Sequence, residues 1–145
     1  MEPVVKRDVE VYEDVAGRCD IADALKRLAR SDPRAFRTIQ NKIELLRQME
    51  MRQALESRLV KQPTATISVL RVQSGPVSFR LPFFESPCHG GKLVLLTHCE
   101  HRSLLRGDRY KAMVDAAERR RQDWVRRNCK EERHANRRAV RADRG

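Results

Sequence analysis

Two arginines and a histidine cluster are the residues of this sequence best suited to chemistry on a phosphate. Arg71 and Arg80 lie in two apolar runs, ISVLRVQ and VSFRLPFF, that flank a Ser-Gly-Pro turn at 74–76. Farther along, the segment 97–102 (THCEHR) places two imidazoles, a carboxylate and a guanidinium where a third apolar run ends. Imidazole can exchange protons near neutral pH, whereas guanidinium stays charged and binds anions. The set predicts acid–base chemistry beside an anionic group.

The two apolar runs around the turn can pair as a β-hairpin. Gly75 and Pro76 can supply the tight reversal. With Ser74 opposite Val77, one side of the ribbon is apolar and the other polar, and a shift by one residue would mix the two sets. This register predicts four further pairs: Val72 with Phe79, Leu70 with Leu81, Gln73 with Ser78 and Arg71 with Arg80.

In this register, Arg71 lies directly opposite Arg80. Like charges paired across strands are destabilising by up to about 1 kcal/mol. Two interpretations follow. Either both guanidinium groups extend to water or to acids elsewhere, or an anion lies between them and removes the repulsion. The second interpretation predicts a phosphate site.

The other elements are predicted from hydrophobic periodicity and helix-start signals. The run 92–99 (KLVLLTHC) is apolar on both faces from Leu93 to Leu96, which predicts a central strand. Residues 5–12 alternate and predict a first strand at a sheet edge. Asp20 is predicted to cap a short helix, and Asp32, followed by proline, is predicted to start a longer one that ends between residues 53 and 57.

Gly107 and Asp108 are predicted to start a long C-terminal helix. Its apolar side ends at Val125 while arginines continue, so residues 127–145 form either a solvated basic helix or a disordered tail. Together the elements predict an α+β domain at residues 1–126, a small and mainly antiparallel sheet of about four strands with two N-terminal helices on one face and a C-terminal helix. The predicted apolar stripes are Ile21, Ala24, Leu25 and Leu28; Phe36, Ile39, Ile43, Leu46 and Met49; and Tyr110, Met113, Val114, Ala117, Trp124 and Val125.

The four cysteines are scattered without a Cys-x-x-Cys pair: Cys19, Cys88, Cys99 and Cys129. In a reducing cytosol all four are expected to be free thiols. Residues 88–89 and 98–101 could supply thiolate and imidazole ligands to zinc, but alternation along a strand would direct His98 and Cys99 to opposite faces. We therefore assign no metal ligand and no cofactor.

Length and charge set the broad class of protein. The chain has 145 residues, a single-domain length, and a formal net charge of +11. This charge predicts attraction to polyanions, with nucleic acid ahead of anionic lipid. The sequence has no run of about eighteen apolar residues and no signal-peptide core at its start. We therefore expect a soluble, cytoplasmic protein without a membrane partner.

The order strand, helix, helix, strand, strand, strand, helix in a small basic chain resembles the RelE/HigB-type toxins of bacterial type II toxin–antitoxin systems, in particular the phage-derived HigB-like branch. Three segments between about residues 4 and 126 carry the resemblance: VLRVQSGPVSFRLPFF, KLVLLTHCEHRSLL and GDRYKAMVDAAERRRQDWV. The first is similar to the family's pattern of Leu-Arg followed, after eight residues, by Arg and a hydrophobic residue. The loop at 86–91 looks longer than is usual in the family, and the basic tail is extra.

The resemblance implies a ribosome-dependent mRNA endoribonuclease that inhibits translation and is neutralised by a small antitoxin, expected to be of the helix-turn-helix type. RNA cleavage by the adjacent 2′-hydroxyl needs a base, an acid and cations around the phosphorane, and a metal is not obligatory. Arg71 and Arg80 match the family's basic sheet positions, and His101-Arg102 falls where many members carry two lysines. The predicted catalytic residues are Arg71, Arg80, His98, His101 and Arg102.

Lys61, Arg106 and Tyr110 are predicted substrate contacts to mRNA or rRNA, although Tyr110 also fits a core position. Two alternatives from other classes remain. A ParE-like toxin shares this fold but inhibits gyrase without cutting RNA. A non-catalytic nucleic-acid-binding module would also explain the net charge of +11, and its binding would weaken steeply with salt and give no cleaved product.

Overall fold

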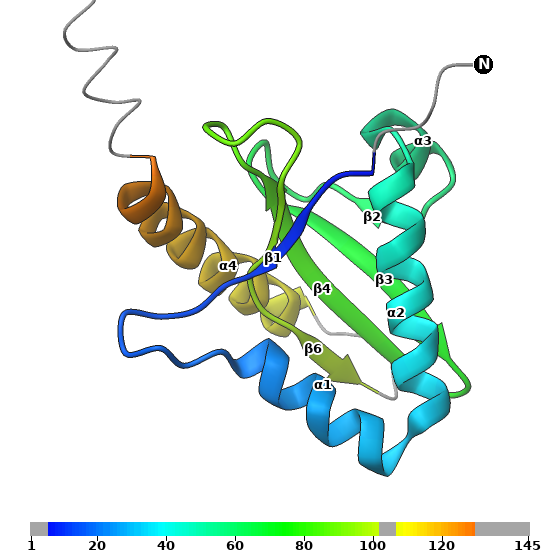
Figure 1. Cartoon of the computed structure of the whole chain (residues 1–145). Coiled ribbons are helices and arrows are strands. Elements are labelled where there is room, and N and C mark those ends of the chain that lie inside the picture. The colour runs from blue at the N-terminus through cyan, green and yellow to red at the C-terminus, as the bar shows by residue number, and fades with distance from the viewer. Residues whose placement is uncertain (1–5, 102–106, 130–145) are drawn as a thin grey trace, which may run out of the picture.

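A mixed β-sheet with helices on both faces forms an α+β fold, the class that the sequence predicts (Figure 1). The computed structural model describes residues 6–101 and 107–129. In this part of the chain the strands are β1 (Val9–Val11), β2 (Val60–Lys61), β3 (Ser68–Ser74), β4 (Val77–Glu85), β5 (Leu93–Leu95) and β6 (Cys99–His101). The helices are α1 (Asp20–Ser31), α2 (Pro33–Gln48), α3 (Met51–Glu56) and α4 (Gly107–Asn128).

The β3–β4 hairpin is the centre of the sheet, and its predicted register is confirmed. Ser74 faces Val77 across Gly75 and Pro76, and Arg71 faces Arg80. Gly75 adopts a φ of 57°, a left-handed conformation that glycine tolerates without steric cost. The apolar and polar residues of the hairpin therefore separate onto opposite faces of the sheet.

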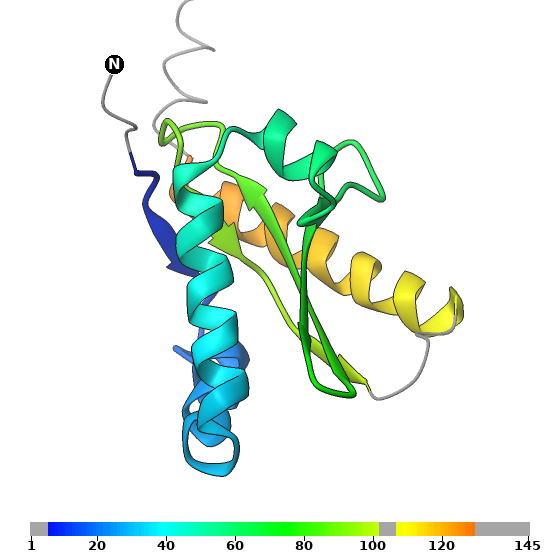
Figure 2. The ribbon, with the colours of Figure 1, turned by 90° about the vertical axis from the view of Figure 1, so that its right-hand side faces the viewer.

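Each face of the sheet has its own hydrophobic core. One core joins the sheet to α1 and α2, with the buried side chains Ile21, Ile39, Leu46, Leu70, Leu81 and Phe83 among its members. The other joins the sheet to α4, with Tyr12, Val69, Phe84, Val94, Leu96 and Trp124. Figure 2 shows α2 and α4 on opposite sides of the sheet. The strands are short, so the helices supply much of the apolar surface that covers them.

The predicted sheet layout requires correction. The order is β1-β5-β4-β3-β2, and β6 pairs with β4 in addition, so the sheet has six strands instead of about four. β1 lies at an edge as predicted, but it runs parallel to β5. Alternation indicates which face a side chain occupies and carries no information on strand direction. β5 and β6 pair with successive parts of β4, where a single strand from residue 92 onward was predicted.

The start of α2 follows a local signal in the sequence, whereas the start of α1 and the end of α2 differ from the prediction and lie beside long-range contacts. Asp32 caps α2 through a hydrogen bond from the Ala35 backbone N–H (3.1 Å), as predicted. The predicted cap Asp20 is instead the first residue of α1, after Cys19, because its carboxylate is engaged by a distant arginine. α2 ends at Gln48, earlier than predicted, and α3 follows.

Arg7 explains the early end of α2. Its guanidinium donates to the carbonyl of Leu46 at 2.8 Å and to that of Met49. The Leu46 carbonyl also accepts from the Met49 backbone N–H, at 3.3 Å. Arg7 therefore supplies further donors to carbonyls at the helix C-terminus, where intrahelical partners run out. Met49 itself has an extended backbone (φ −103°, ψ 148°).

α4 continues to Asn128, past the domain boundary predicted at residue 126. Of the predicted tail, residues 130–145 lie outside the described part of the chain. The described helices include none that combines the length and the apolar character needed to cross a membrane.

Candidate nucleic-acid interface

A groove of about 830 Å³ lies on the sheet face that also carries α4, at the hairpin end that the helix leaves uncovered. We call it the basic groove. Four cationic side chains line it: Arg58, Lys61, Arg71 and Arg80. His101, Tyr110, Gln73 and Ser78 complete its polar lining. In the described part of the chain, no carboxylate lines the groove.

Strand pairing brings three of the predicted catalytic side chains together. Arg71 pairs with Arg80 across the hairpin, and on the other side of β4 Arg80 pairs with Cys99. Two residues along, Ser78 pairs with His101. Because side chains alternate along strands and stand in register across them, Arg71, Arg80 and His101 occupy one face of three neighbouring strands.

Tyr110 and Lys61 form one wall of the groove. The Lys61 ammonium lies 5.6 Å from the centroid of the Tyr110 ring, within the range of a cation–π interaction. The Tyr110 hydroxyl is buried, and among the described residues it has no hydrogen-bond partner. A buried hydroxyl without a partner costs free energy, so a ligand atom that completes this hydrogen bond would be favoured here.

The electrostatics of the groove favour an anion. Burial lowers the pKa of Arg80, and repulsion from Arg71 lowers it further. Burial raises the pKa of Tyr110, while the positive charges of Arg80 and Arg71 oppose that rise. Burial is the larger cause of both shifts, and the closeness of the two guanidinium groups adds to the lowering of the Arg80 pKa. A phosphate between the two guanidinium groups would remove this repulsion.

His98 does not belong to the basic groove. It lines a separate cavity of about 260 Å³ on the α1 side of the sheet, together with Glu100 and the apolar side chains of Ile21 and Phe79. His98 lies three positions before His101, and side chains an odd number of positions apart point to opposite faces of an extended chain. The prediction that both histidines serve one site is therefore not supported by their positions.

Two predicted site residues, Arg102 and Arg106, lie outside the described residues. Arg58 also lines the basic groove and was not among the predicted site residues. Arg58 follows α3 and has a φ of 64°, in the left-handed region. Glycine is the usual residue at such a helix end, so the sequence carries no signal that would have singled out this arginine.

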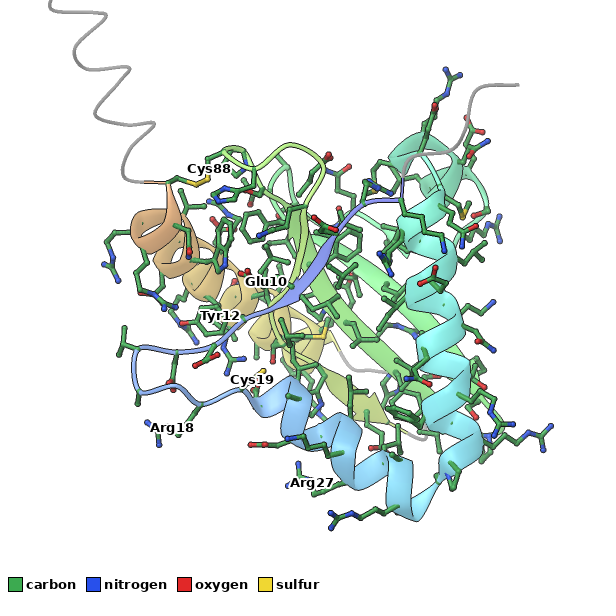
Figure 3. All side chains as sticks on the ribbon, viewed as in Figure 1. Glu10, Tyr12, Arg18, Cys19, Arg27 and Cys88 are labelled. Carbon is green, nitrogen blue, oxygen red and sulfur yellow. A yellow bond between two sulfur atoms is a disulfide. The ribbon has the colours of Figure 1, made fainter. Side chains whose placement is uncertain are left out.

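The prediction of four free thiols is wrong for two of them. Cys88 and Cys129 form a disulfide across 41 residues, while Cys19 and Cys99 are free. Figure 3 shows Cys88 beside the end of α4 and Cys19 at the start of α1. The packing of α4 on the sheet brings the end of this helix to the β4–β5 loop, which spacing in the sequence does not reveal.

Comparison with known proteins gives no assignment. No protein-family model matches the chain, and no curated protein matches it.

Proposed function

We propose that this chain is the toxin of a type II toxin–antitoxin pair and acts in the cytoplasm as a RelE/HigB-type, ribosome-dependent mRNA endoribonuclease. The observation that carries the proposal is the pairing of Arg71 with Arg80 in a groove that also contains His101 and Tyr110. Cleavage of RNA through its own 2′-hydroxyl needs a base, an acid and cations, and an imidazole, a phenol and two guanidinium groups can supply them. The order of the elements supports the same proposal.

Arg71 and Arg80 would bind the scissile phosphate and stabilise the negative charge of the phosphorane. His101 would take the proton from the 2′-hydroxyl, whose oxygen attacks phosphorus to give a 2′,3′-cyclic phosphate. The Tyr110 hydroxyl is a donor suited to the departing 5′-oxygen, because a phenol is protonated at neutral pH and this one has no other hydrogen-bond partner among the described residues. Lys61 would contact a neighbouring phosphate.

The proposed partners are mRNA on the ribosome, rRNA, and a small antitoxin of the helix-turn-helix type. Antitoxin binding would stop cleavage by occupying or closing the basic groove. A gene for such a small protein next to the gene for this chain would support the pairing.

The test is cleavage of a translated message by full-length protein in the presence of ribosomes, followed by primer extension. His101→Ala should slow cutting by about 100- to 10,000-fold, the usual contribution of general acid–base catalysis. His98→Ala is the matched control, since this histidine lies in the cavity on the opposite face, and it should cut at close to the wild-type rate.

Full-length message in every lane would contradict the nuclease proposal. Equal losses in the two histidine variants, with unchanged melting temperatures, would contradict the assignment of the groove as the active site.

The second candidate is non-catalytic binding of nucleic acid, favoured by the net charge of +11. Under this alternative the protein would bind RNA with a steep salt dependence, and His101→Ala would change neither binding nor message length. A ParE-like toxin would instead inhibit gyrase-dependent supercoiling, which can be assayed with the same preparations.

A further inference from the structure

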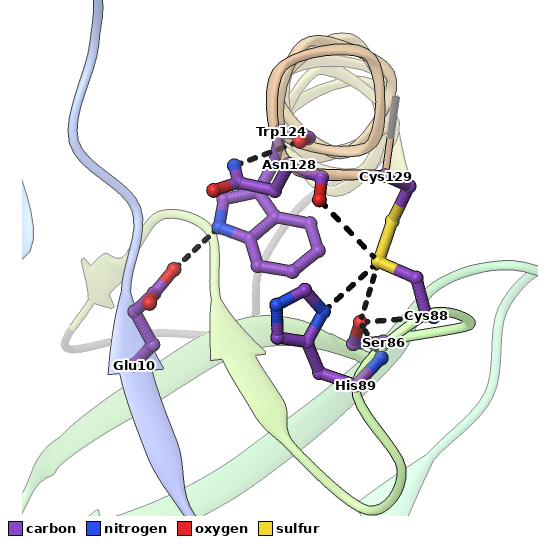
Figure 4. The surroundings of a disulfide bond; sticks show 7 residues. All are labelled: Glu10, Ser86, Cys88, His89, Trp124, Asn128 and Cys129. Atoms are coloured by element: carbon purple, nitrogen blue, oxygen red, sulfur yellow. Dashed lines mark hydrogen bonds between the residues drawn. A yellow bond between two sulfur atoms is a disulfide. The ribbon is translucent and has the colours of Figure 1, made fainter. Parts of the chain in front are cut away.

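The loop between β4 and β5 and the end of α4 bring three metal-binding side chains together, far from the basic groove. Cys88, His89 and Cys129 place their ligand atoms within 4.8 Å of one another. His89 Nδ1 lies 3.0 Å from Cys88 Sγ. Figure 4 shows the imidazole and the two sulfur atoms below the last turn of α4. Among the described residues this is the one group of three or more such ligands.

We propose that Cys88, His89 and Cys129 form a thiol-dependent zinc site, in which the Cys88–Cys129 disulfide and a bound Zn²⁺ exclude each other. Thiolate and imidazole are the preferred ligands of Zn²⁺, at about 2.3 Å and 2.0–2.1 Å. Tetrahedral geometry then separates the two sulfur atoms by about 3.7 Å. The Cα atoms of the two cysteines are 5.7 Å apart, a spacing that allows either state with side-chain rotation alone.

The surroundings hold these ligands in position. The Ser86 hydroxyl oxygen accepts hydrogen bonds from the backbone N–H of Cys88 (3.3 Å) and of His89 (3.1 Å). The His89 ring packs edge-on against Trp124, with 5.9 Å between ring centroids. Trp124 is in turn fixed by a hydrogen bond from its indole N–H to Glu10. Outer contacts of this kind orient metal ligands and raise metal affinity.

The step from disulfide to metal site balances with a small-molecule thiol as reductant. Two molecules of that thiol reduce the disulfide, so that the Cys88–Cys129 sulfur–sulfur bond breaks and the disulfide of the reductant forms. Cys88 and Cys129 each gain a proton. Zn²⁺ then binds the two sulfur atoms as thiolates and displaces both protons. The described chain supplies three ligands.

This site would act as a clamp and take no part in the proposed nuclease chemistry. Tyr110 and Cys129 are 19 residues apart, and at about 1.5 Å per residue the helix separates them by about 29 Å. A bound metal would hold the end of α4 on the β4–β5 loop when the disulfide is reduced. The inference therefore does not depend on the proposed function.

The experiment is a titration of reduced, full-length protein with Co²⁺ alone, followed by displacement with Zn²⁺. The expected result is one Co²⁺ per chain, with thiolate-to-cobalt absorption that Zn²⁺ abolishes. The oxidised protein should bind none. Cys88→Ser should weaken binding by more than about a hundredfold, beyond the usual loss of an outer contact. Cys99→Ser is the matched control and should bind like the wild type.

Loss of the His89 ring removes a contact with Trp124, so the melting temperature of the metal-free variant is the control. His89→Ala tests the third ligand at an exposed position. It should weaken Co²⁺ binding by at least about tenfold, and Zn²⁺ should raise its melting temperature less than that of the reduced wild type. Absence of stoichiometric binding to the reduced wild type would overturn the proposal. Equal binding by wild type and Cys88→Ser, or by wild type and His89→Ala, would overturn it as well.

Discussion

The face of the sheet that carries α4 has two halves, and the arginines of the two halves differ in what they contact. At the β1–β5 half, Arg120 and Arg127 of α4 pair with carboxylates. Arg120 contacts Asp20 at 2.8 Å, and Arg127 contacts Asp123 at 2.7 Å. At the hairpin half, Arg71 and Arg80 face each other, and no carboxylate of the described chain lines the groove.

The two halves differ in whether the positive charges have acidic partners within the described chain. Arg120 also donates to the carbonyl of Leu96 at 2.8 Å and lies 5.3 Å from the Tyr12 ring centroid. Its hydrogen-bonding capacity serves the packing of α4 on β1 and β5. Arg71 is exposed, and Arg80 is partly buried beside it and donates once to the Phe79 carbonyl, at 3.2 Å. The other guanidinium donors are available for a ligand.

The largest expected contrast is in RNA cleavage. Arg80→Ala should reduce the cutting rate by about 100- to 1,000-fold, the usual loss when one preorganised donor to a developing anion is removed. Its unfolding free energy should fall by less than about 1 kcal/mol, because among the described residues Arg80 makes no ion pair and the variant loses one hydrogen bond to the Phe79 carbonyl. Cleavage assays and chemical denaturation measure the two quantities.

Arg120→Ala is the matched control for this contrast. It should retain cutting and lose about 1–2 kcal/mol of stability, since a charged hydrogen-bond donor shared by Asp20 and a backbone carbonyl disappears. If Arg80→Ala instead destabilised the protein as much as Arg120→Ala, the distinction between the two halves would fail.

A smaller effect is expected in the pH dependence of stability. The Tyr12 hydroxyl and two arginines hold the pKa of Asp123 at about 2, and Arg121 holds that of Glu118 at about 2. Folded-state pKa values below the ordinary ones give stability that is present above about pH 4.5 and is lost as pH falls towards 2. Denaturation between pH 2 and pH 6 should show this loss.

In Asp123→Asn, the free energy of unfolding lost between pH 6 and pH 2 should be smaller than in the wild type by about 1–2 kcal/mol. Arg71→Ala should leave it unchanged, because no carboxylate lines the groove in the described chain. If Arg71→Ala changed the pH dependence of stability as much as Asp123→Asn, the hairpin arginines would have an acidic partner. The two halves of the sheet face would then not differ in the way described.

The smallest expected effect is in salt dependence. Lys61→Ala should reduce the slope of log affinity against log salt for single-stranded RNA by about 0.7, the value for one lost phosphate contact. Lys6→Ala is the matched control, because Lys6 is paired with Glu44 at 2.7 Å, and it should leave the slope unchanged. Binding titrations at several salt concentrations distinguish the two, and equal slopes in both variants would argue against Lys61 as a phosphate contact.

The sequence by itself determined the features that depend on neighbours along the chain. Alternation of apolar and polar residues around Gly75 and Pro76 was enough to place Arg71 opposite Arg80. This succeeds because a slip of one residue would bury the polar set and expose the apolar one. The Asp32 cap followed by proline likewise depends only on local backbone geometry.

Only the tertiary structure decided the features that depend on long-range contacts. It determined the parallel pairing of β1 with β5, the end of α2 at the carbonyls bound by Arg7, and the meeting of Cys88 with Cys129. It also separated His98 from His101, on opposite faces of the sheet, and added Arg58 to the basic groove. The physical reason is that these contacts follow from how α4 and the N-terminal segment pack on the sheet, and short-range patterns carry no record of that packing.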